Sequence, residues 1–186
     1  SSAASDVYKR QLKYRSDVQT QTGVENVLRN TPMYNTNFTY TNNAGKNVSI
    51  KYSKAFMEAA AASKVSPYHL ASRVKQEVVI SSTMMSSSVS GNVAGYKGIY
   101  NFYNIGANSG ANAVKNGLKW ASTGTDYSRP WNNRYRSIYG GACYIGKQYI
   151  NVGQNTLYLQ KFNVTATKRY DHQYMANICL LYTSDA

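Results

Sequence analysis

The stretch SPYHLASRVKQEVVI, residues 66–80, decides the fold of the central part of the chain. Ser66 and Pro67 are preferred residues for the N-cap and the first turn of a helix, so we expect a helix to begin here. Apolar residues then recur at helical spacing and predict a face that packs against a core. This face consists of Leu70, Ala71, Val74 and Val78.

Glu77 lies at the edge of this apolar face, and three apolar residues follow it directly. Partial burial disfavours the charged form of a carboxyl group, and so does the negative end of the helix dipole in the last turn. Both effects predict a raised pKa for Glu77 and a protonated side chain near neutral pH. Glycoside hydrolysis uses such a group to protonate the leaving oxygen. The alternative is an ordinary surface ion pair with Arg73, one helical turn earlier.

The rest of the chain predicts a mainly helical α+β domain with one small β element. Residues 38–52 alternate apolar and polar side chains around Asn-Asn-Ala-Gly, which is typical of a β-hairpin. Residues 81–99 are small, polar and rich in glycine, which indicates a mobile loop or a thin β-lobe. Further helices are expected over residues 20–31, over 53–64 with Ser53 as the N-cap, and over 112–120, 132–150 and 168–178.

The expected helix over 132–150 contains two features whose role the sequence leaves open. The pair Gly140-Gly141 marks either close packing or a break in the helix. Cys143 and the second cysteine, Cys179, lack the close spacing of a metal site. One disulfide is an option, and two independent small residues is the interpretation that we favour.

The chain carries a large excess of positive charge, with 21 Lys and Arg against 8 Asp and Glu and a net charge of +13. Such a charge attracts nucleic acids, anionic lipid surfaces or the teichoic acids of a bacterial wall. Tyrosine dominates the aromatic residues, with 18 Tyr against 4 Phe and 2 Trp. Its flat face and its hydroxyl suit the binding of sugars or bases. No apolar run is long enough to span a bilayer.

The two ends, residues 1–11 and 179–186, are predicted to be non-native read-through, which leaves residues 12–178 as a single domain. The two flanks together carry two basic and two acidic side chains, so the excess of positive charge is unchanged. Within the domain, two acids lie in a weak N-terminal segment, and Glu58 is expected to face solvent. The acids that remain for acid–base chemistry are Glu77, Asp126 and Asp171.

Other catalytic motifs are missing from the sequence. No serine lies in a G-x-S-x-G elbow, and no H-E-x-x-H occurs. A hydrolytic triad or a zinc site is therefore poorly supported, and neither a metal nor a cofactor is expected.

Five stretches follow one another in the order SPYHLASRVKQEV, YNFYNIGA, RPWNNRYRSIYGGACYIGKQYI, GQNTLYLQKFNV and HQYMANI. Together, from Thr31 to Ile178, they resemble the glucosaminidase domain of bacterial wall hydrolases, of the glycoside hydrolase family 73 type and closest to the stand-alone Gram-positive form. The resemblance implies a lysozyme-like helical bundle with a small β-hairpin lobe beside a substrate groove. It implies cleavage of the β-1,4 bond after N-acetylglucosamine in peptidoglycan. The family's general-acid glutamate ends the helix with the KQE motif, which is the position of Glu77.

The resemblance also implies where the sugar binds. The family's Asn-aromatic-aromatic stretch matches Asn101, Phe102 and Tyr103, and we expect Tyr103 to face the sugar and Phe102 to lie in the core. Tyr174 matches a functional tyrosine of the closing helix, with Tyr170 in reserve. The other substrate-binding residues that it implies are Asn104, Trp131 and Asn132, and core packing is an equal alternative for Trp131.

The sequence departs from the family at the second carboxylate. Many members carry a second glutamate in the β-lobe, whereas residues 81–103 contain no Asp or Glu. Asp171 and Asp126 are the candidates for this role. The alternative is assistance by the substrate's own 2-acetamido group, oriented by Tyr103 or Tyr174. Whether the mechanism is retaining, inverting or substrate-assisted stays open.

Two other functions compete with the wall hydrolase. A non-catalytic module that binds anionic wall polymers would explain the missing lobe carboxylate, and a basic, tyrosine-rich protein suits nucleic acid. The ordered motifs and the scattered basic residues favour the hydrolase and no nucleic-acid partner. Its expected partners are peptidoglycan strands, with teichoic acid or a membrane partner as further options. Its expected location is extracellular, at the cell wall or cell surface, with the export signal outside this chain.

Overall fold

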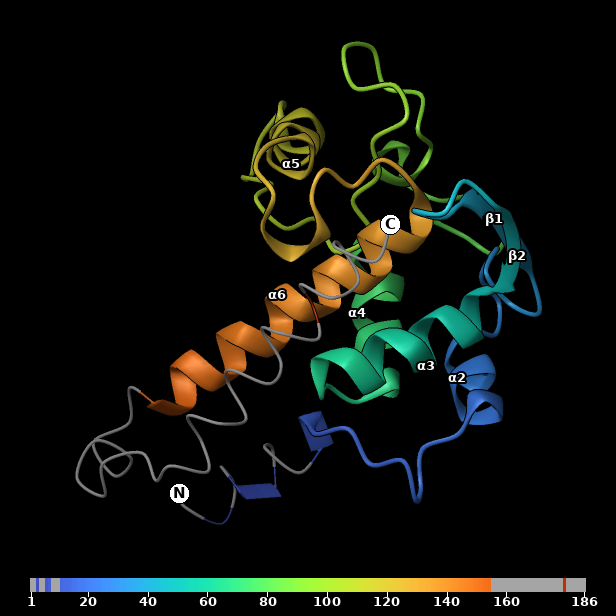
Figure 1. Ribbon diagram of the computed structural model, residues 1–186, viewed down its shortest axis with the longest axis vertical. Coiled ribbons are helices and arrows are strands. Elements are labelled where there is room, and N and C mark those ends of the chain that lie inside the picture. Colours follow the sequence, from blue (N-terminus) through green and yellow to red (C-terminus); the bar gives the residue numbers. More distant parts are fainter. Residues whose placement is uncertain (1–2, 4–5, 8–10, 155–178, 180–186) are drawn as a thin grey trace.

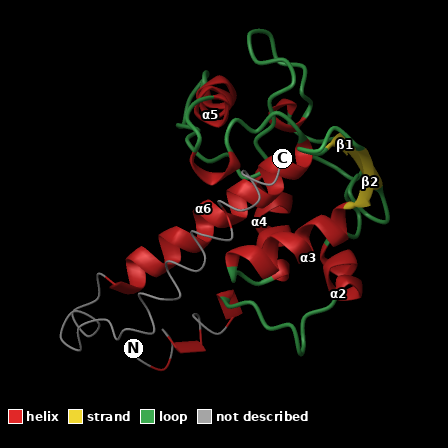
Figure 2. Ribbon diagram, viewed as in Figure 1, coloured by secondary structure: helices red, strands yellow, loops and turns green. Residues whose placement is uncertain are grey.

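The described part of the computed structural model comprises residues 3, 6–7, 11–154 and 179, and side chains are described up to residue 149 of the last helix. Its elements in chain order are α2 (Gln21–Val27), β1 (Asn37–Thr41), β2 (Asn47–Lys51), α3 (Tyr52–Ser63), α4 (Pro67–Val78), the 3-10 helix η1 (Ser87–Val89), α5 (Ala113–Ser122), the 3-10 helix η2 (Asp126–Ser128) and α6 (Arg134–Gln154). This content confirms the prediction of a mainly helical α+β fold with a small β element (Figure 2).

The long helix α6 runs through the molecule, with α3 packed along it and the β1–β2 hairpin at one end (Figure 1). Helix α4 packs on α3 with the apolar face that the sequence predicts. All four residues of that face are buried: Leu70, Ala71, Val74 and Val78. Ser66 caps α4 as expected, since its Oγ accepts hydrogen bonds from the N–H groups of Tyr68 and His69, and Pro67 opens the first turn.

The predicted hairpin is confirmed and is fixed to the helices by aromatic contacts. Phe38 pairs with Ile50 across the two antiparallel strands. The ring of Phe38 lies 4.7 Å from that of Tyr52 at the start of α3. The ring of Tyr40 stacks on Tyr135 of α6 at 4.7 Å between centroids. The hairpin therefore packs one face on the helical core.

Two predicted details of the helices are wrong. Ser53 does not cap α3, because the helix begins one residue earlier, at Tyr52. The buried hydroxyl of Ser53 instead accepts from Gln21 and donates to Glu25, which joins α3 to α2. Glu58 does not simply face solvent either: it is partly buried, and its carboxylate accepts a 2.7 Å hydrogen bond from the Tyr135 hydroxyl.

The segment 81–99 forms neither a strand nor a sheet lobe within the part of the chain that the structure describes. Its regular structure is limited to η1 and one antiparallel bridge between Val79 and Met85. Ser88 and Val89 are buried, and the Ser88 carbonyl accepts from the Asn101 N–H at 2.8 Å, which ties η1 to the segment that follows. The prediction that residues 81–99 are mobile stays a prediction.

The two cysteines form a disulfide, so the interpretation of two independent cysteines is wrong. Cys143 is buried on α6, and its Cα lies 6.2 Å from that of Cys179, 36 residues later in the chain. That separation gives no local signal of pairing, because only the tertiary fold brings the two positions together. The non-native origin predicted for residues 179–186 stays a prediction.

The closing helix expected over 168–178 lies outside the described residues. Among the helices that are described, none has both the length and the apolarity needed to cross a membrane.

Candidate functional site

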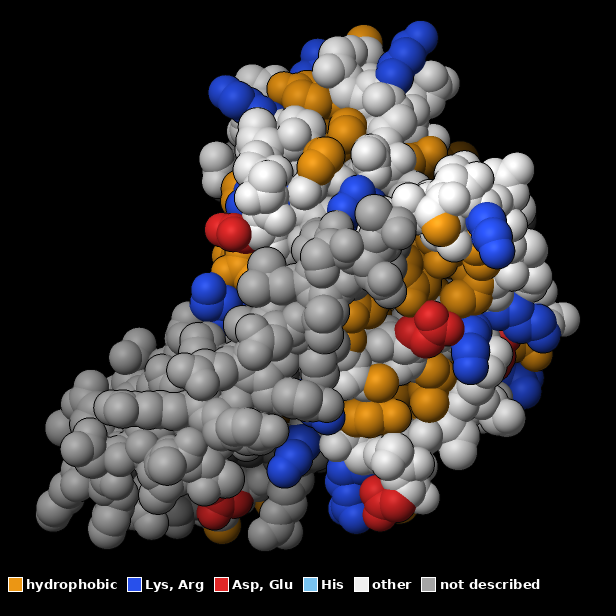
Figure 3. Space-filling model, viewed as in Figure 1, with side chains coloured by type: hydrophobic (Ala, Val, Ile, Leu, Met, Phe, Trp, Pro, Cys, Tyr) orange, Lys and Arg blue, Asp and Glu red, His pale blue; other side chains and the backbone are white. Residues whose placement is uncertain are grey.

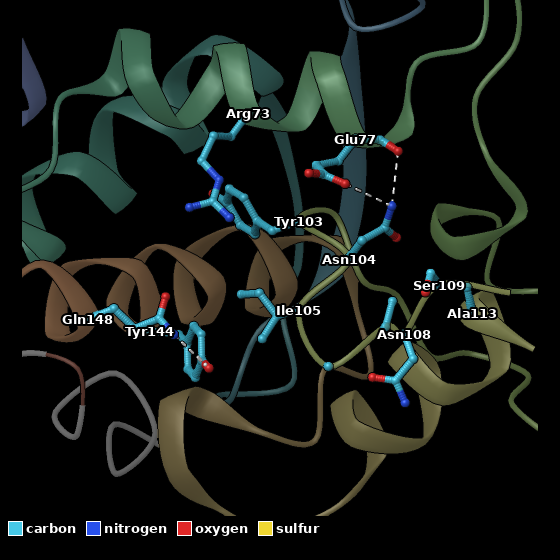
Figure 4. Close-up of a pocket in the computed structure, with 12 residues that line it drawn as sticks. Arg73, Glu77, Tyr103, Asn104, Ile105, Asn108, Ser109, Ala113, Tyr144 and Gln148 are labelled. Carbon is cyan, nitrogen blue, oxygen red and sulfur yellow. Dashed lines mark hydrogen bonds between the residues drawn. The ribbon is translucent and has the colours of Figure 1, made fainter.

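A polar groove of about 480 Å³ lies between α4, the segment after residue 102 and α6 (Figure 4). This volume falls in the range of ligand-binding clefts. Polar or aromatic side chains line much of it: Arg73, Glu77, Tyr103, Asn104, Asn108, Ser109, Tyr144 and Gln148. The groove therefore offers hydrogen-bonding groups together with aromatic rings, a combination that suits a sugar.

The carboxylate of Glu77 reaches the groove from the last turn of α4. The Nδ2 group of Asn104 donates to Glu77 Oε2 at 3.3 Å and to the Glu77 carbonyl oxygen at 3.0 Å (Figure 4). The same amide thus hydrogen-bonds a main-chain carbonyl at the end of the helix and also contacts the Glu77 carboxylate. The arrangement positions Glu77 at the rim of the groove with one oxygen available to a ligand.

The backbone around Asn104 explains how its amide comes to face Glu77. Asn104 has φ +52°, in the left-handed region that asparagine tolerates better than most residues. The preceding turn is fixed by the buried side chain of Asn101. The Asn101 amide donates to the carbonyls of Ile105 and Gly117 at 2.8 and 3.0 Å, and its oxygen accepts from the Ile105 N–H. Asn101 therefore fixes the turn that carries Asn104. Its own hydrogen-bonding groups face the protein rather than the groove.

The structure corrects two statements about Glu77. Its side chain is exposed, so the predicted partial burial is wrong. The apolar residue that follows, Val78, turns into the core, and Glu77 projects from the flank of the helix toward the groove. The alternative of a surface ion pair is wrong as well, because no ion pair or hydrogen bond joins Glu77 to Arg73 within the described chain.

Two aromatic residues expected to bind sugar are buried. Tyr103 forms part of the groove wall, but its hydroxyl donates to the Ile138 carbonyl at 2.8 Å, and burial raises its pKa well above the ordinary value. Trp131 is fully buried, and its Nε1–H donates to the Tyr127 carbonyl at 2.8 Å. Of the two alternatives for Trp131, this placement corresponds to core packing. Phe102 is buried, as expected.

The remaining predicted residues do not join the groove within the described chain. Asn132 and Asp126 are both exposed, and neither is among the residues that line the groove. Tyr170, Asp171 and Tyr174 lie outside the described residues. Of the predicted set, the structure brings together Glu77, Tyr103 and Asn104.

The groove also contains residues that the sequence interpretation missed. Tyr144 and Gln148 form its α6 wall, and the Gln148 amide donates to the Tyr144 hydroxyl at 2.9 Å. The Tyr144 ring is held edge-on against Trp120 and Tyr127, with centroids 5.3 and 5.1 Å away. Arg73 faces the groove from α4. A spacing of four residues places two side chains on one face of a helix, and it links Tyr144 to Gln148 and Arg73 to Glu77. This spacing was the sequence signal that could have indicated these groove residues.

His69 of α4 and Tyr149 of α6 connect these two helices outside the groove. The Tyr149 hydroxyl and His69 Nε2 share a short hydrogen bond, and the two rings meet edge to face. Burial, together with the nearby Arg73, lowers the pKa of His69 from 6.5 to about 4. His69 is therefore neutral at physiological pH. No group of three His, Cys, Asp or Glu side chains suited to a metal ion occurs among the described residues.

We expect His69 to make the stability of the protein depend on pH. Because the pKa of His69 is lower in the folded chain, the unfolded chain binds more protons between pH 6.5 and about 4, and the free energy of unfolding falls as the pH falls through this range. Urea unfolding of the parent and of His69→Gln at several pH values measures this contribution. The free energy of unfolding of the parent, relative to that of His69→Gln, should fall toward pH 4. A difference that stays constant with pH would contradict the prediction.

Comparison with known proteins finds several similar chains, and two of them are described below. A protein named beta-N-acetylglucosaminidase, from Bacillus subtilis (strain 168), is 32% identical over 142 residues, which cover 75% of this chain and 15% of that protein. A protein named bifunctional autolysin, from Staphylococcus epidermidis, is 35% identical over 79 residues, 42% of this chain and 5% of that protein. This chain thus spans a small part of the length of either relative. No protein-family profile matches it. No solved structure matches it either.

Proposed function

We propose that this chain is a peptidoglycan hydrolase that cleaves the β-1,4 bond after N-acetylglucosamine, with Glu77 as the general acid. The observation that carries the proposal is the Glu77 carboxyl group, held by Asn104 at the rim of a polar groove of about 480 Å³. The similarity to a beta-N-acetylglucosaminidase and to autolysins supports a wall hydrolase in general. The order of the sequence motifs supports the specific bond.

In the proposed reaction, protonated Glu77 donates its proton to the glycosidic oxygen as the bond from that oxygen to the anomeric carbon breaks. The leaving sugar departs as an alcohol, and the positive charge that develops on the other sugar ring must be stabilised from its opposite face. The amides of Asn108 and Gln148 line the same groove and suit hydrogen bonds to sugar hydroxyl and acetamido groups. After the second step, in which water attacks the anomeric carbon, Glu77 recovers its proton.

The group that stabilises the developing charge has two candidate sources. Among the described residues that line the groove, Glu77 is the one carboxylate, which favours the substrate's own acetamido group. Asp171, outside the described residues, is the alternative. Inversion in the first product would identify a carboxylate that activates water, whereas retention is compatible with attack by the acetamido oxygen or by a carboxylate nucleophile.

The product ends test the proposal directly. Peptide-free glycan strands are incubated with the protein, and the new reducing ends are identified by mass spectrometry. New N-acetylglucosamine ends support the proposal, whereas new N-acetylmuramic acid ends would identify a muramidase. No new ends, with the protein still pelleting on purified walls, would leave a binding module.

That second candidate, a non-catalytic module for anionic wall polymers, is favoured by two observations. The described groove lining has a single carboxylate, and the chain has a net charge of +13. Lys and Arg side chains are spread over the visible face rather than gathered in one stripe (Figure 3). A spread charge suits a diffuse anionic wall better than the track of a nucleic-acid backbone.

Removing the amide of Asn104 is expected to lower kcat about tenfold, because a hydrogen bond of about 1.5 kcal/mol no longer holds the Glu77 carboxyl group in place at the groove. Asn104→Gly and Asn104→Ala both remove the donor to Glu77. Glycine adopts the positive φ of this position freely, whereas alanine adds strain. A similar loss of kcat in both variants, with lower stability for the alanine variant, would show that catalysis depends on the Asn104 amide. A kcat loss confined to Asn104→Ala would contradict this and point to the backbone.

A further inference from the structure

Arg73 places a positive charge in the same groove as the proposed general acid. It lies four residues before Glu77 on α4, so the two positions are about 6 Å apart along the helix axis. Figure 4 shows its side chain reaching from α4 across Tyr103 toward the α6 wall, away from Glu77.

Among the described residues, no side chain forms an ion pair with the guanidinium of Arg73. His69, four residues before Arg73 on α4, is neutral and bonded to Tyr149 instead. The planar guanidinium has five N–H donors, and it binds a carboxylate with two parallel hydrogen bonds. An arginine left open toward a polar groove is therefore suited to a carboxylate on the ligand.

We propose that Arg73 binds a carboxylate of the glycan and makes the groove selective for strands that carry one beside the cleaved bond. This inference rests on the proposed function, since muramic acid is the sugar that alternates with N-acetylglucosamine in peptidoglycan. In peptide-free strands the carboxylate is that of the muramic acid lactyl group. In strands that keep their peptides the lactyl carboxyl is an amide, and the available carboxylates belong to the peptide.

The experiment compares the same peptide-free strands with free carboxylates and with carboxylates converted to methylamides. The parent should cleave the free form with a kcat/KM about tenfold higher, since one charge-assisted contact is removed. Arg73→Gln should lose this preference, mainly through KM, and should cleave the methylamide form as well as the parent does. Arg73→Lys keeps the charge without the paired donors and should fall between the two.

Lys75→Gln is the matched control. It removes one positive charge from the same helix, two residues along, but Lys75 is exposed and donates to the Val27 carbonyl rather than lining the groove. Its preference for the free carboxylates should equal that of the parent. An equal loss of preference in Lys75→Gln would show that the overall field of the protein is responsible, and it would overturn the role of Arg73.

Other outcomes decide the remaining questions. A parent without preference, or an Arg73→Gln variant that is equally impaired on both forms, would overturn the proposal and indicate a positioning role toward Glu77. If the parent cleaves neither form, the hydrolase proposal fails. The affinities of the parent and of Arg73→Gln for the two forms then still test whether Arg73 selects the free carboxylate. Strands that keep their peptides, with and without amidated peptide carboxylates, show whether the lactyl group or the peptide supplies the charge.

Discussion

Glu77→Gln is expected to lower the rate of glycan cleavage by roughly 10²–10⁴-fold, the range that a positioned general acid contributes. The amide has nearly the shape of the carboxyl group but cannot donate its proton to a leaving oxygen. Because Glu77 is exposed and contacts Asn104 through its side chain, the substitution should leave the fold intact. The measurement is the appearance of new reducing ends, with thermal unfolding of both proteins as the check on folding.

A change of leaving group tests the role of Glu77 more sharply. An aryl glycoside with a strongly acidic phenol leaves without a proton, so Glu77→Gln should lose far less activity on such a substrate than on the natural glycan. A variant that is impaired equally on both substrates would contradict the general-acid role and favour one in binding or positioning.

Two further variants complete this test. Asp17→Asn makes the same acid-to-amide change at an exposed carboxylate whose recorded partner is the surface residue Arg15. It should cleave like the parent, because such a pair contributes little. Glu77→Asp keeps the acid but withdraws it by one methylene group from the groove, so partial activity is expected. Full activity in Glu77→Gln would end the hydrolase proposal as it stands.

The fold could be predicted wherever local rules decide it. The Ser66-Pro67 start and the four buried positions of α4 follow from capping preference and helical period, and both are found in the structure. The hairpin follows from alternation around a turn sequence. In these places, each residue's preference depends on neighbours within a few positions.

The site was less predictable because it is assembled from segments far apart in the chain. The exposure of Glu77 depends on the groove formed by residues after 102 and by α6, which no periodicity within α4 reveals. The pairing of Tyr144 with Gln148 was visible as a spacing, but its position opposite Glu77 was not. Trp131 shows the same limit, since only the tertiary fold shows the full burial and the hydrogen bond to Tyr127 that separate a core role from a sugar-binding role. Arguments from one helix therefore made Glu77 a candidate but did not predict its surroundings.

The glycine pair in α6 links the fold to the groove. The sequence left two interpretations, close packing or a break, and the structure shows close packing within a continuous helix. A Cβ on Gly140 would collide with the backbone carbonyl oxygen of Tyr127 and with the Trp131 Nε1 that donates to it. A Cβ on Gly141 would collide with the Tyr103 ring, which forms part of the groove wall. The absence of side chains here lets two loops approach the helix.

Gly140→Ala is therefore expected to lower the free energy of unfolding by about 3 kcal/mol, the upper part of the usual cost of overpacking. The sign opposes helix propensity, by which alanine is favoured over glycine by about 1 kcal/mol in a helix interior. Lys119→Ala, at an exposed position of the helix α5, is the control and should change stability by less than about 0.5 kcal/mol. Urea unfolding measures both variants. A Gly140→Ala variant as stable as the parent would show that α6 does not pack closely against the Tyr127 carbonyl.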